Sequence, residues 1–206
     1  MALEDNLVSA LIGALAAVIL REGFIWIWRP RLEVDFEEFG GKKPYVHQFT
    51  ETGSSMMFQQ VPPRAIRVLR LRVHDGGGRA AEACEAKLEV RRDGALDPAV
   101  FILHWARRDP RIFKELDQVY APVTINRGGS EALDVLRLAE SSQRIESIST
   151  QTFWFEPNVK YELTVVITSA NAGPVAFRMM LEWDGAWDGL GSSVARESSF
   201  PILSPT

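Results

Sequence analysis

The residues of this chain that could do chemistry are few, and their spacing matches no catalytic pattern. The three histidines, His47, His74 and His104, lack the close spacing of metal ligands, so we expect structural or surface roles for them. The single cysteine, Cys84, falls on the apolar face of an alternating segment, which favours an inert core thiol over a nucleophile. Neither a nucleophile elbow, a phosphate loop nor paired cysteines occur. The sequence therefore predicts no enzyme activity, no catalytic, cofactor-binding or metal-binding residue, and no cofactor.

Composition narrows the classes of partner and the size of the fold. The formal net charge of -4 argues against nucleic acid as a partner, because binding phosphates usually needs a basic excess. One cysteine cannot form an intramolecular disulfide, which is typical of a reducing compartment. With 206 residues and 46% hydrophobic content, the chain is long enough for one domain and an anchor.

The first predicted element is a transmembrane helix from about Leu7 to Trp28. Its roughly 22 residues would extend about 33 Å, enough to cross a hydrocarbon core of about 30 Å. Two tryptophans lie where an interfacial aromatic belt would lie, and Pro30 is a natural helix stop. We therefore expect residues 1–29 to form a membrane anchor that includes Leu7, Leu11, Leu15, Ile19, Arg21, Glu22, Trp26 and Trp28.

Arg21 and Glu22 leave other interpretations of this segment open. A charge at the bilayer centre costs about 3 kcal/mol on insertion scales, although an arginine in the last third of a span can reach the headgroups. Only 14 fully apolar residues precede the two charges. A cleaved signal peptide, an amphipathic helix lying in the interface and a buried core helix are the alternatives.

The charges that flank the predicted span indicate its orientation. No lysine or arginine precedes it, whereas Arg29, Arg31, Lys42 and Lys43 follow closely. The positive-inside rule therefore predicts a single-pass protein of the cell membrane with its globular domain in the cytoplasm. An extracellular domain is the alternative.

Residues 30–190 read as an antiparallel β-sandwich, because the hydrophobic period changes to two after the anchor. Residues 83–90, 161–168 and 177–183 alternate most clearly, and Ile66 and Val68, out of phase with Leu69, suggest a bulge in segment 66–74. The glycines after Asp75 suggest a tight reversal or bulged hairpin. Further strands are expected within residues 31–37, 45–49, 100–105, 132–138 and 145–155, and Trp183 and Trp187 are expected to complete the core and to cover its edge.

Two stretches of the chain resemble CARDB-type and related prokaryotic Ig-like domains. The run LRLRVHDGGGRAAEACEAKLEVRRDG looks like their hairpin, with a polar glycine turn between two strands. The run VTINRGGSEALDVLRL is similar to a later element, in which a glycine-centred turn leads into another strand. The resemblance implies an Ig-like binding or spacer module, usually outside the cell, and it implies no catalytic residue.

Residues 103–122 interrupt the regular strand pattern as an insertion rich in charge and aromatic residues, with room for a short helix. Long insertions on rigid scaffolds often carry binding sites. The candidate interaction surface is therefore Trp105, Arg107, Arg108, Arg111, Phe113 and Lys114. Residues 191–206 lack periodicity and are expected to form a flexible tail.

These features predict a non-enzymatic membrane protein whose sandwich binds another protein, as an accessory subunit would. Its partners would be membrane lipid, through the helix, and that protein. A surface filament subunit with bundled N-terminal helices is the first alternative, and a hydrolase on a β scaffold is the second. The sequence leaves the small-molecule ligand and the oligomeric state open.

Overall fold

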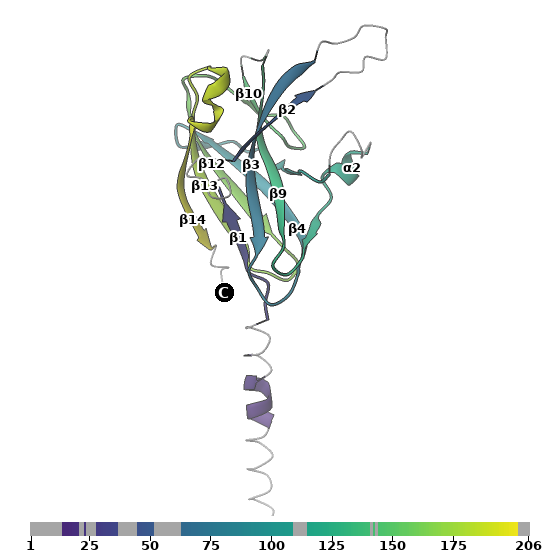
Figure 1. Ribbon diagram of the computed structural model, residues 1–206. Coiled ribbons are helices and arrows are strands. Elements are labelled where there is room, and N and C mark those ends of the chain that lie inside the picture. The colour runs from purple at the N-terminus through teal and green to yellow at the C-terminus, as the bar shows by residue number, and fades with distance from the viewer. Residues whose placement is uncertain are drawn as a thin grey trace, which may run out of the picture.

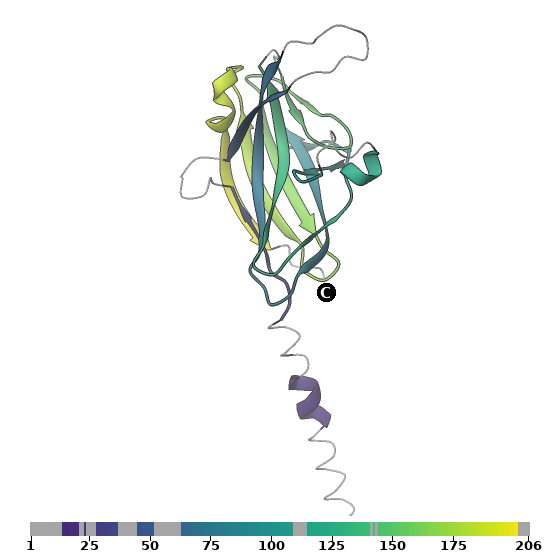
Figure 2. The ribbon, with the colours of Figure 1, turned by 45° about the vertical axis from the view of Figure 1, so that its right-hand side comes forward.

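The chain folds into two antiparallel β-sheets packed face to face (Figures 1 and 2). The computed structural model describes residues 14–20, 23, 28–36, 45–51, 63–108, 115–140, 142 and 144–201. The prediction of a mainly β, antiparallel sandwich is confirmed. Each predicted strand segment overlaps at least one strand of the structure.

The first sheet has seven strands and is centred on two long ones, β3 and β9, which pair over most of their length. Its main path runs β1-β3-β9-β10-β11, with β2 paired to β3 and β7 paired to β9. The strands are β1 (Leu32–Asp35), β2 (Val46–Glu51), β3 (Arg64–Asp75), β7 (His104–Trp105), β9 (Ser130–Ala139), β10 (Ile145–Ser147) and β11 (Trp154–Phe155).

The second sheet also has seven strands, in the order β14-β13-β12-β4-β5, with β6 and β8 paired to β4. The strands are β4 (Ala81–Arg92), β5 (Ala95–Leu96), β6 (Phe101–Ile102), β8 (Val123–Ile125), β12 (Lys160–Thr168), β13 (Val175–Glu182) and β14 (Val194–Pro201). Two short helices, α2 (Leu116–Val119) and the 3-10 helix η1 (Trp187–Gly191), lie in connections.

The core lies between the sheets and contains the faces that the period-two pattern predicts. On β4 from Cys84 to Val90 and on β12 from Tyr161 to Ile167, every second side chain is buried, while charged residues between them, such as Glu89, face outward. Trp183 is buried, and its indole N–H donates to the carbonyl oxygen of Ala186 at 2.7 Å. Trp187 is partly buried and packs against the core, as predicted.

The bulge predicted within residues 66–74 is not in β3, because the extra residue is on the partner strand β9. Leu69 pairs with Leu136 and Arg70 with Asp134, so Val135 of β9 is the unpaired residue. Ile66 and Val68 keep the phase of β3 and pack with Ala139 in a second, smaller hydrophobic cluster on the outer face of the sheet.

The glycines after Asp75 do not form a hairpin turn, contrary to the prediction. β3 lies in the first sheet and β4 in the second, so residues 76–80 cross between the two layers. Neither Gly76 nor Gly77 has a positive φ, so left-handed backbone is not the reason for these glycines. A two-residue hairpin turn does occur at Asp93 and Gly94, which have φ of 51° and 80°.

The prediction of a flexible tail after residue 190 is wrong for the residues up to 201. β14 pairs antiparallel with β13 from Val194 to Pro201 and forms an edge of the second sheet. A shift in this pairing between Arg178 and Met179 explains why the segment shows no regular alternation.

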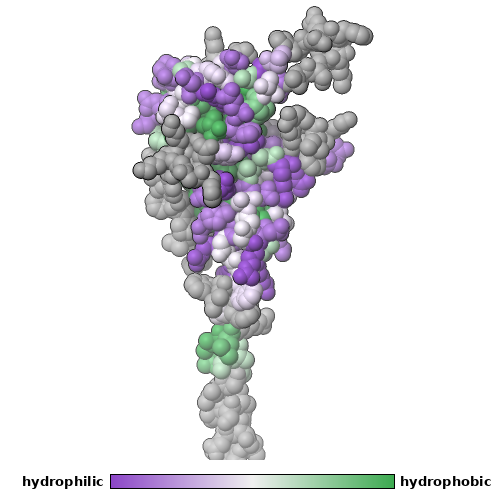
Figure 3. All heavy atoms as spheres, viewed as in Figure 1, coloured by the Kyte–Doolittle hydropathy of each residue, from purple (hydrophilic) through white to green (hydrophobic). Residues whose placement is uncertain are grey.

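The predicted anchor falls mostly outside the described residues, among them Leu7, Leu11, Arg21, Glu22 and Trp26. Residues 14–20 are helical and lie beyond the end of the sandwich at which β1 begins (Figures 1 and 3). Leu15 and Ile19 are each 63% exposed and Leu20 is 73% exposed, so these residues are not part of the sandwich core. Within the described residues, no helix has the length and hydrophobicity needed to cross a membrane.

Candidate functional site

A groove of about 220 Å³ on the outer face of the first sheet combines polar and apolar side chains. We call it the outer groove. It is lined by His47, Phe49, Thr50, Glu51, Val68, Arg70, His104, Asp134, Arg137 and Ile148. These residues come from β2, β3, β7, β9 and the segment after β10, which the sheet order brings together. A concave surface of this mixed composition is the usual form of a binding site.

The polar floor of the outer groove is a buried cluster around Asp134. Arg70 Nε donates to Asp134 Oδ1 at 2.5 Å, and His104 Nδ1 lies 3.4 Å from Asp134 Oδ2. The side chains of Asp134 and His104 are only 8% and 6% exposed, and that of Arg70 is 17% exposed. A buried carboxylate needs a charged partner such as Arg70, because an isolated carboxylate would be strongly destabilising.

The imidazole of His104 is held by its surroundings. Its Nε2–H donates to the carbonyl oxygen of Arg108 at 2.6 Å, since a carbonyl can only accept. Its Nδ1 is buried beside Asp134 and has no hydrogen-bond partner among the described residues. Both ring nitrogens thus face fixed protein groups, an arrangement that positions β7 on β9 rather than one that offers a free base.

His47 lies at the more open side of the same groove. Burial is the main cause that lowers its pKa below the ordinary 6.5, and the positive charge of Arg70 lowers it further. Asp134 acts in the opposite direction. The imidazole is therefore biased towards its neutral form near pH 7.

Glutamates neutralise the arginines at the rim of the outer groove. Glu51 Oε2 accepts from Arg64 at 2.8 Å and from Arg137 at 2.9 Å, and Arg137 also lies 3.3 Å from Glu146. Arg67 donates to Gln48 and Trp187, and its guanidinium lies 4.9 Å from the Trp187 ring. The basic side of β3 is thus largely paired within the domain, which favours a structural role for these arginines.

The structure does not support the predicted interaction surface as a unit. Trp105 is 1% exposed and belongs to the core, so it cannot touch a partner. Arg107 is exposed and pairs with Glu131 at 2.9 Å, and the Arg108 carbonyl holds His104. Arg111, Phe113 and Lys114 lie outside the described residues. The short helix for which the insertion had room is α2.

A second feature is the junction between the N-terminal helix and the sandwich, formed by residues 28–31, 75–80 and 126–129. Backbone hydrogen bonds join Gly76 N–H to the Arg31 carbonyl at 2.9 Å and Gly78 N–H to the Arg29 carbonyl at 3.3 Å. Asp75, fully buried, accepts from the amides of Arg31 and Gly77, both at 2.9 Å. Its backbone also bonds to Gly128 and Gly129.

Position 77 requires glycine because the backbone of residues 29–31 lies very close to it. A Cβ at this position would lie 2.3 Å from the Arg29 carbonyl oxygen and 2.5 Å from the Arg31 nitrogen. Only glycine lets the two backbones pack at this separation. The glycine-rich segment that the sequence suggested to be a turn therefore holds residues 29–31, which we call the linker. We call the hydrogen bonds and close packing between residues 75–78 and the linker the clamp.

No group of residues that could hold a metal occurs in the described part of the chain. The thiol of Cys84 is fully buried, and burial raises its pKa from 9.0 to about 11. It therefore stays protonated and unreactive near neutral pH.

Comparisons with family models, with curated proteins and with solved structures find no match to this chain. The resemblance to CARDB-type domains stays an expectation.

Proposed function

We propose that this protein is a non-enzymatic, single-pass membrane protein whose β-sandwich docks another protein. The observation that carries the proposal is the junction. Two backbone hydrogen bonds and the Asp75 carboxylate fix residues 29–31 to the end of the sandwich. A domain on a loose tether would not need such a clamp, whereas a domain held at a set orientation to a membrane helix would.

The exposed apolar residues of the helical segment support the anchor. Leu15, Val18, Ile19 and Leu20 lie away from the sandwich, and they form the hydrophobic surface seen in Figure 3. Exposed apolar area of this kind is costly in water and is stable in lipid. The arginines that follow the helix support a cytoplasmic domain, because positive charge flanking a span favours the cytoplasmic side.

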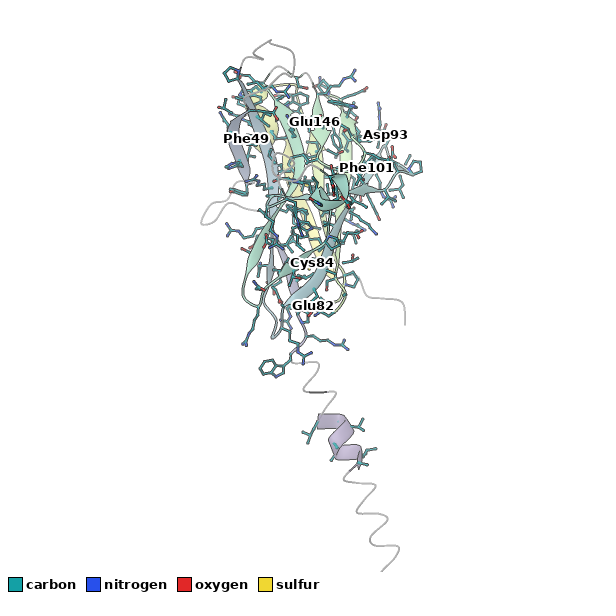
Figure 4. The ribbon with its side chains drawn as sticks, turned by 90° about the vertical axis from the view of Figure 1, so that its right-hand side faces the viewer. Phe49, Glu82, Cys84, Asp93, Phe101 and Glu146 are labelled. Atoms are coloured by element: carbon teal, nitrogen blue, oxygen red, sulfur yellow. The ribbon has the colours of Figure 1, made fainter. Side chains whose placement is uncertain are left out.

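The outer groove is the proposed docking site, and its proposed occupant is an extended segment of the partner protein. Figure 4 shows that Phe49, which lines the groove, lies far from the helix, whereas Glu82 lies near it, so the groove would lie at a distance from the bilayer. β2, which lines the groove, pairs with β3 along one edge, and no described strand pairs with its other edge. A free edge can bind an extended segment through its main chain, and Phe49 and Ile148 provide an apolar contact beside it.

Photocrosslinking in membranes tests the docking site. A crosslinker at Gln48, exposed on β2, should give one discrete adduct, and the same group at Arg178 on the second sheet should not. Equal adducts at both positions would refute the outer groove as the site. Adducts between two differently tagged copies of this chain would instead favour the filament subunit, in which exposed helices of several copies bundle.

Sidedness has a separate test. A cysteine at Gly173, an exposed loop position with no atom within 4 Å of an added Cβ, would be labelled in intact cells only if the domain were outside. The native Cys84 is buried and should stay unlabelled. Labelling by a membrane-impermeant reagent would overturn the cytoplasmic orientation.

A further inference from the structure

The end of the sandwich at the junction carries four exposed arginines. Arg29, Arg31, Arg79 and Arg127 are all exposed, and within the described residues none of them lies within ion-pair distance of a carboxylate. They come from the linker, the β3–β4 connection and the β8–β9 turn, three separate segments that the clamp brings to one end. We call them the junction arginines.

Few carboxylates balance the junction arginines. Asp75 is fully buried, and its Oδ1 accepts from two backbone amides. Glu33 lies 3.1 Å from His74 on the outer face of the first sheet. Glu82 is exposed at this end (Figure 4). A chain with a net charge of -4 therefore concentrates positive charge at one end, which a random surface distribution would not favour.

Trp28 adds an amphipathic group to the same end. It is 37% exposed, and the Arg127 guanidinium lies 5.6 Å from the centroid of its ring. An indole beside a guanidinium is a stable arrangement through cation–π attraction. Tryptophan at the end of a membrane helix is also typical of the headgroup level.

We propose that the junction arginines bind the headgroups of anionic phospholipids, so that this end of the sandwich rests on the membrane surface. The inference rests on the proposed anchor and specifies a second, electrostatic contact with the same bilayer. The clamp supports it, because a fixed linker keeps the arginines at the level where the helix leaves the membrane. Each arginine near the membrane surface raises the binding constant for anionic lipid about fivefold, and this effect falls off within a Debye length.

The test uses the full chain, reconstituted into vesicles, with a fluorophore on a cysteine at Gly173. This residue lies in the β12–β13 loop, which is joined to the junction end by hydrogen bonds from Asn171 to Ala80 and from Ala170 to Glu82. Vesicles contain either phosphatidylcholine alone or phosphatidylcholine with about one-third phosphatidylglycerol, and a trace of lipid with a headgroup quencher. Quenching should be stronger in the anionic vesicles, and high salt should abolish the difference.

Two double variants decide whether the junction arginines are responsible. R79Q/R127Q should lower the equilibrium constant for surface contact by roughly 25-fold, which is about fivefold for each arginine. R144Q/R178Q, which removes the same charge from exposed arginines elsewhere, should behave like the parent chain. Equal effects of the two variants, or equal quenching of the parent in neutral and anionic vesicles, would overturn the inference.

A carbonate wash separates failure of this inference from failure of the anchor. A chain that resists extraction but shows no dependence on lipid charge would refute only the contact by the junction arginines. Extraction of the chain from both kinds of vesicle would refute the anchor, and this inference with it.

Discussion

Replacing Gly77 by alanine is the sharpest test of the junction. The added methyl group would lie 2.3 Å from the Arg29 carbonyl oxygen, 2.5 Å from the Arg31 nitrogen and 2.6 Å from the Pro30 Cα. All three contacts are with backbone, so no side-chain rotation can relieve them. The linker must move away from residues 76–78.

The magnitude follows from the hydrogen bonds that this movement breaks. Gly76 and Gly78 would lose their bonds to the linker carbonyls, and Asp75 would lose the amide of Arg31. At about 1 kcal/mol for each net hydrogen bond, we expect G77A to lower the free energy of unfolding by about 2–3 kcal/mol. Loss of the Arg31 amide leaves the fully buried Asp75 carboxylate with the Gly77 amide as its remaining donor among the described residues.

Urea unfolding of the full chain in detergent micelles measures this effect, with a lower midpoint and an unchanged slope expected. The matched control is G173A, at an exposed glycine where a Cβ meets nothing within 4 Å. That change should leave stability the same or raise it slightly, because alanine restricts the unfolded chain. A G77A variant as stable as the parent would refute the close packing of linker and loop.

Three further predictions concern the core, the outer groove and the thiol of Cys84. Trp105→Ala should lower the free energy of unfolding by about 3–5 kcal/mol, whereas Arg107→Ala, at an exposed ion pair, should lower it by less than about 1 kcal/mol in the same urea assay. Equal losses would argue against the burial of the Trp105 indole. Asp134→Ala leaves Arg70 without its buried partner and should lower the free energy of unfolding by about 3–5 kcal/mol. A double variant with Arg70→Met should recover most of this loss. No recovery would show that the ion pair is not the cause. The pKa of Cys84 is about 11 in the fold against 9.0 for an unperturbed thiol, so its contribution to stability is complete below pH 9 and is lost as the pH rises towards 11. Thiol reagents at pH 8 should therefore react with Cys84 only in urea. Rapid labelling of the native chain would contradict the burial of the thiol.

The faces of the long strands could be predicted from the sequence because they follow a simple physical rule. A strand with one buried side alternates, and Leu88, Val165 and Met179 are buried as that rule requires. The short strands β7 and β11 fall within predicted strand segments, but two residues are too few to show by alternation which side is buried. Trp105 was therefore interpreted as a surface residue, although its two-residue strand pairs with β9 and buries the indole.

Close packing between distant backbone segments also could not be predicted from the sequence. Three glycines after a strand are typical of a turn, and nothing local shows that Gly77 faces a linker more than 40 residues earlier in the chain. The wrong turn assignment and the missed clamp thus have one cause, since glycine serves both for positive φ and for close approach.

The outer groove shows most clearly why a site can escape a periodicity argument. Arg70 is opposite Asp134 only because Val135 is an extra residue in β9. In an unbroken ladder, the pairing of Leu69 with Leu136 would put Val135 opposite Arg70, and residues opposite each other share a face. A valine would then stand on the outer face, where Arg70 now has a carboxylate. The bulge therefore creates the ion pair and the polar floor of the groove, and it becomes visible only when both strands are paired.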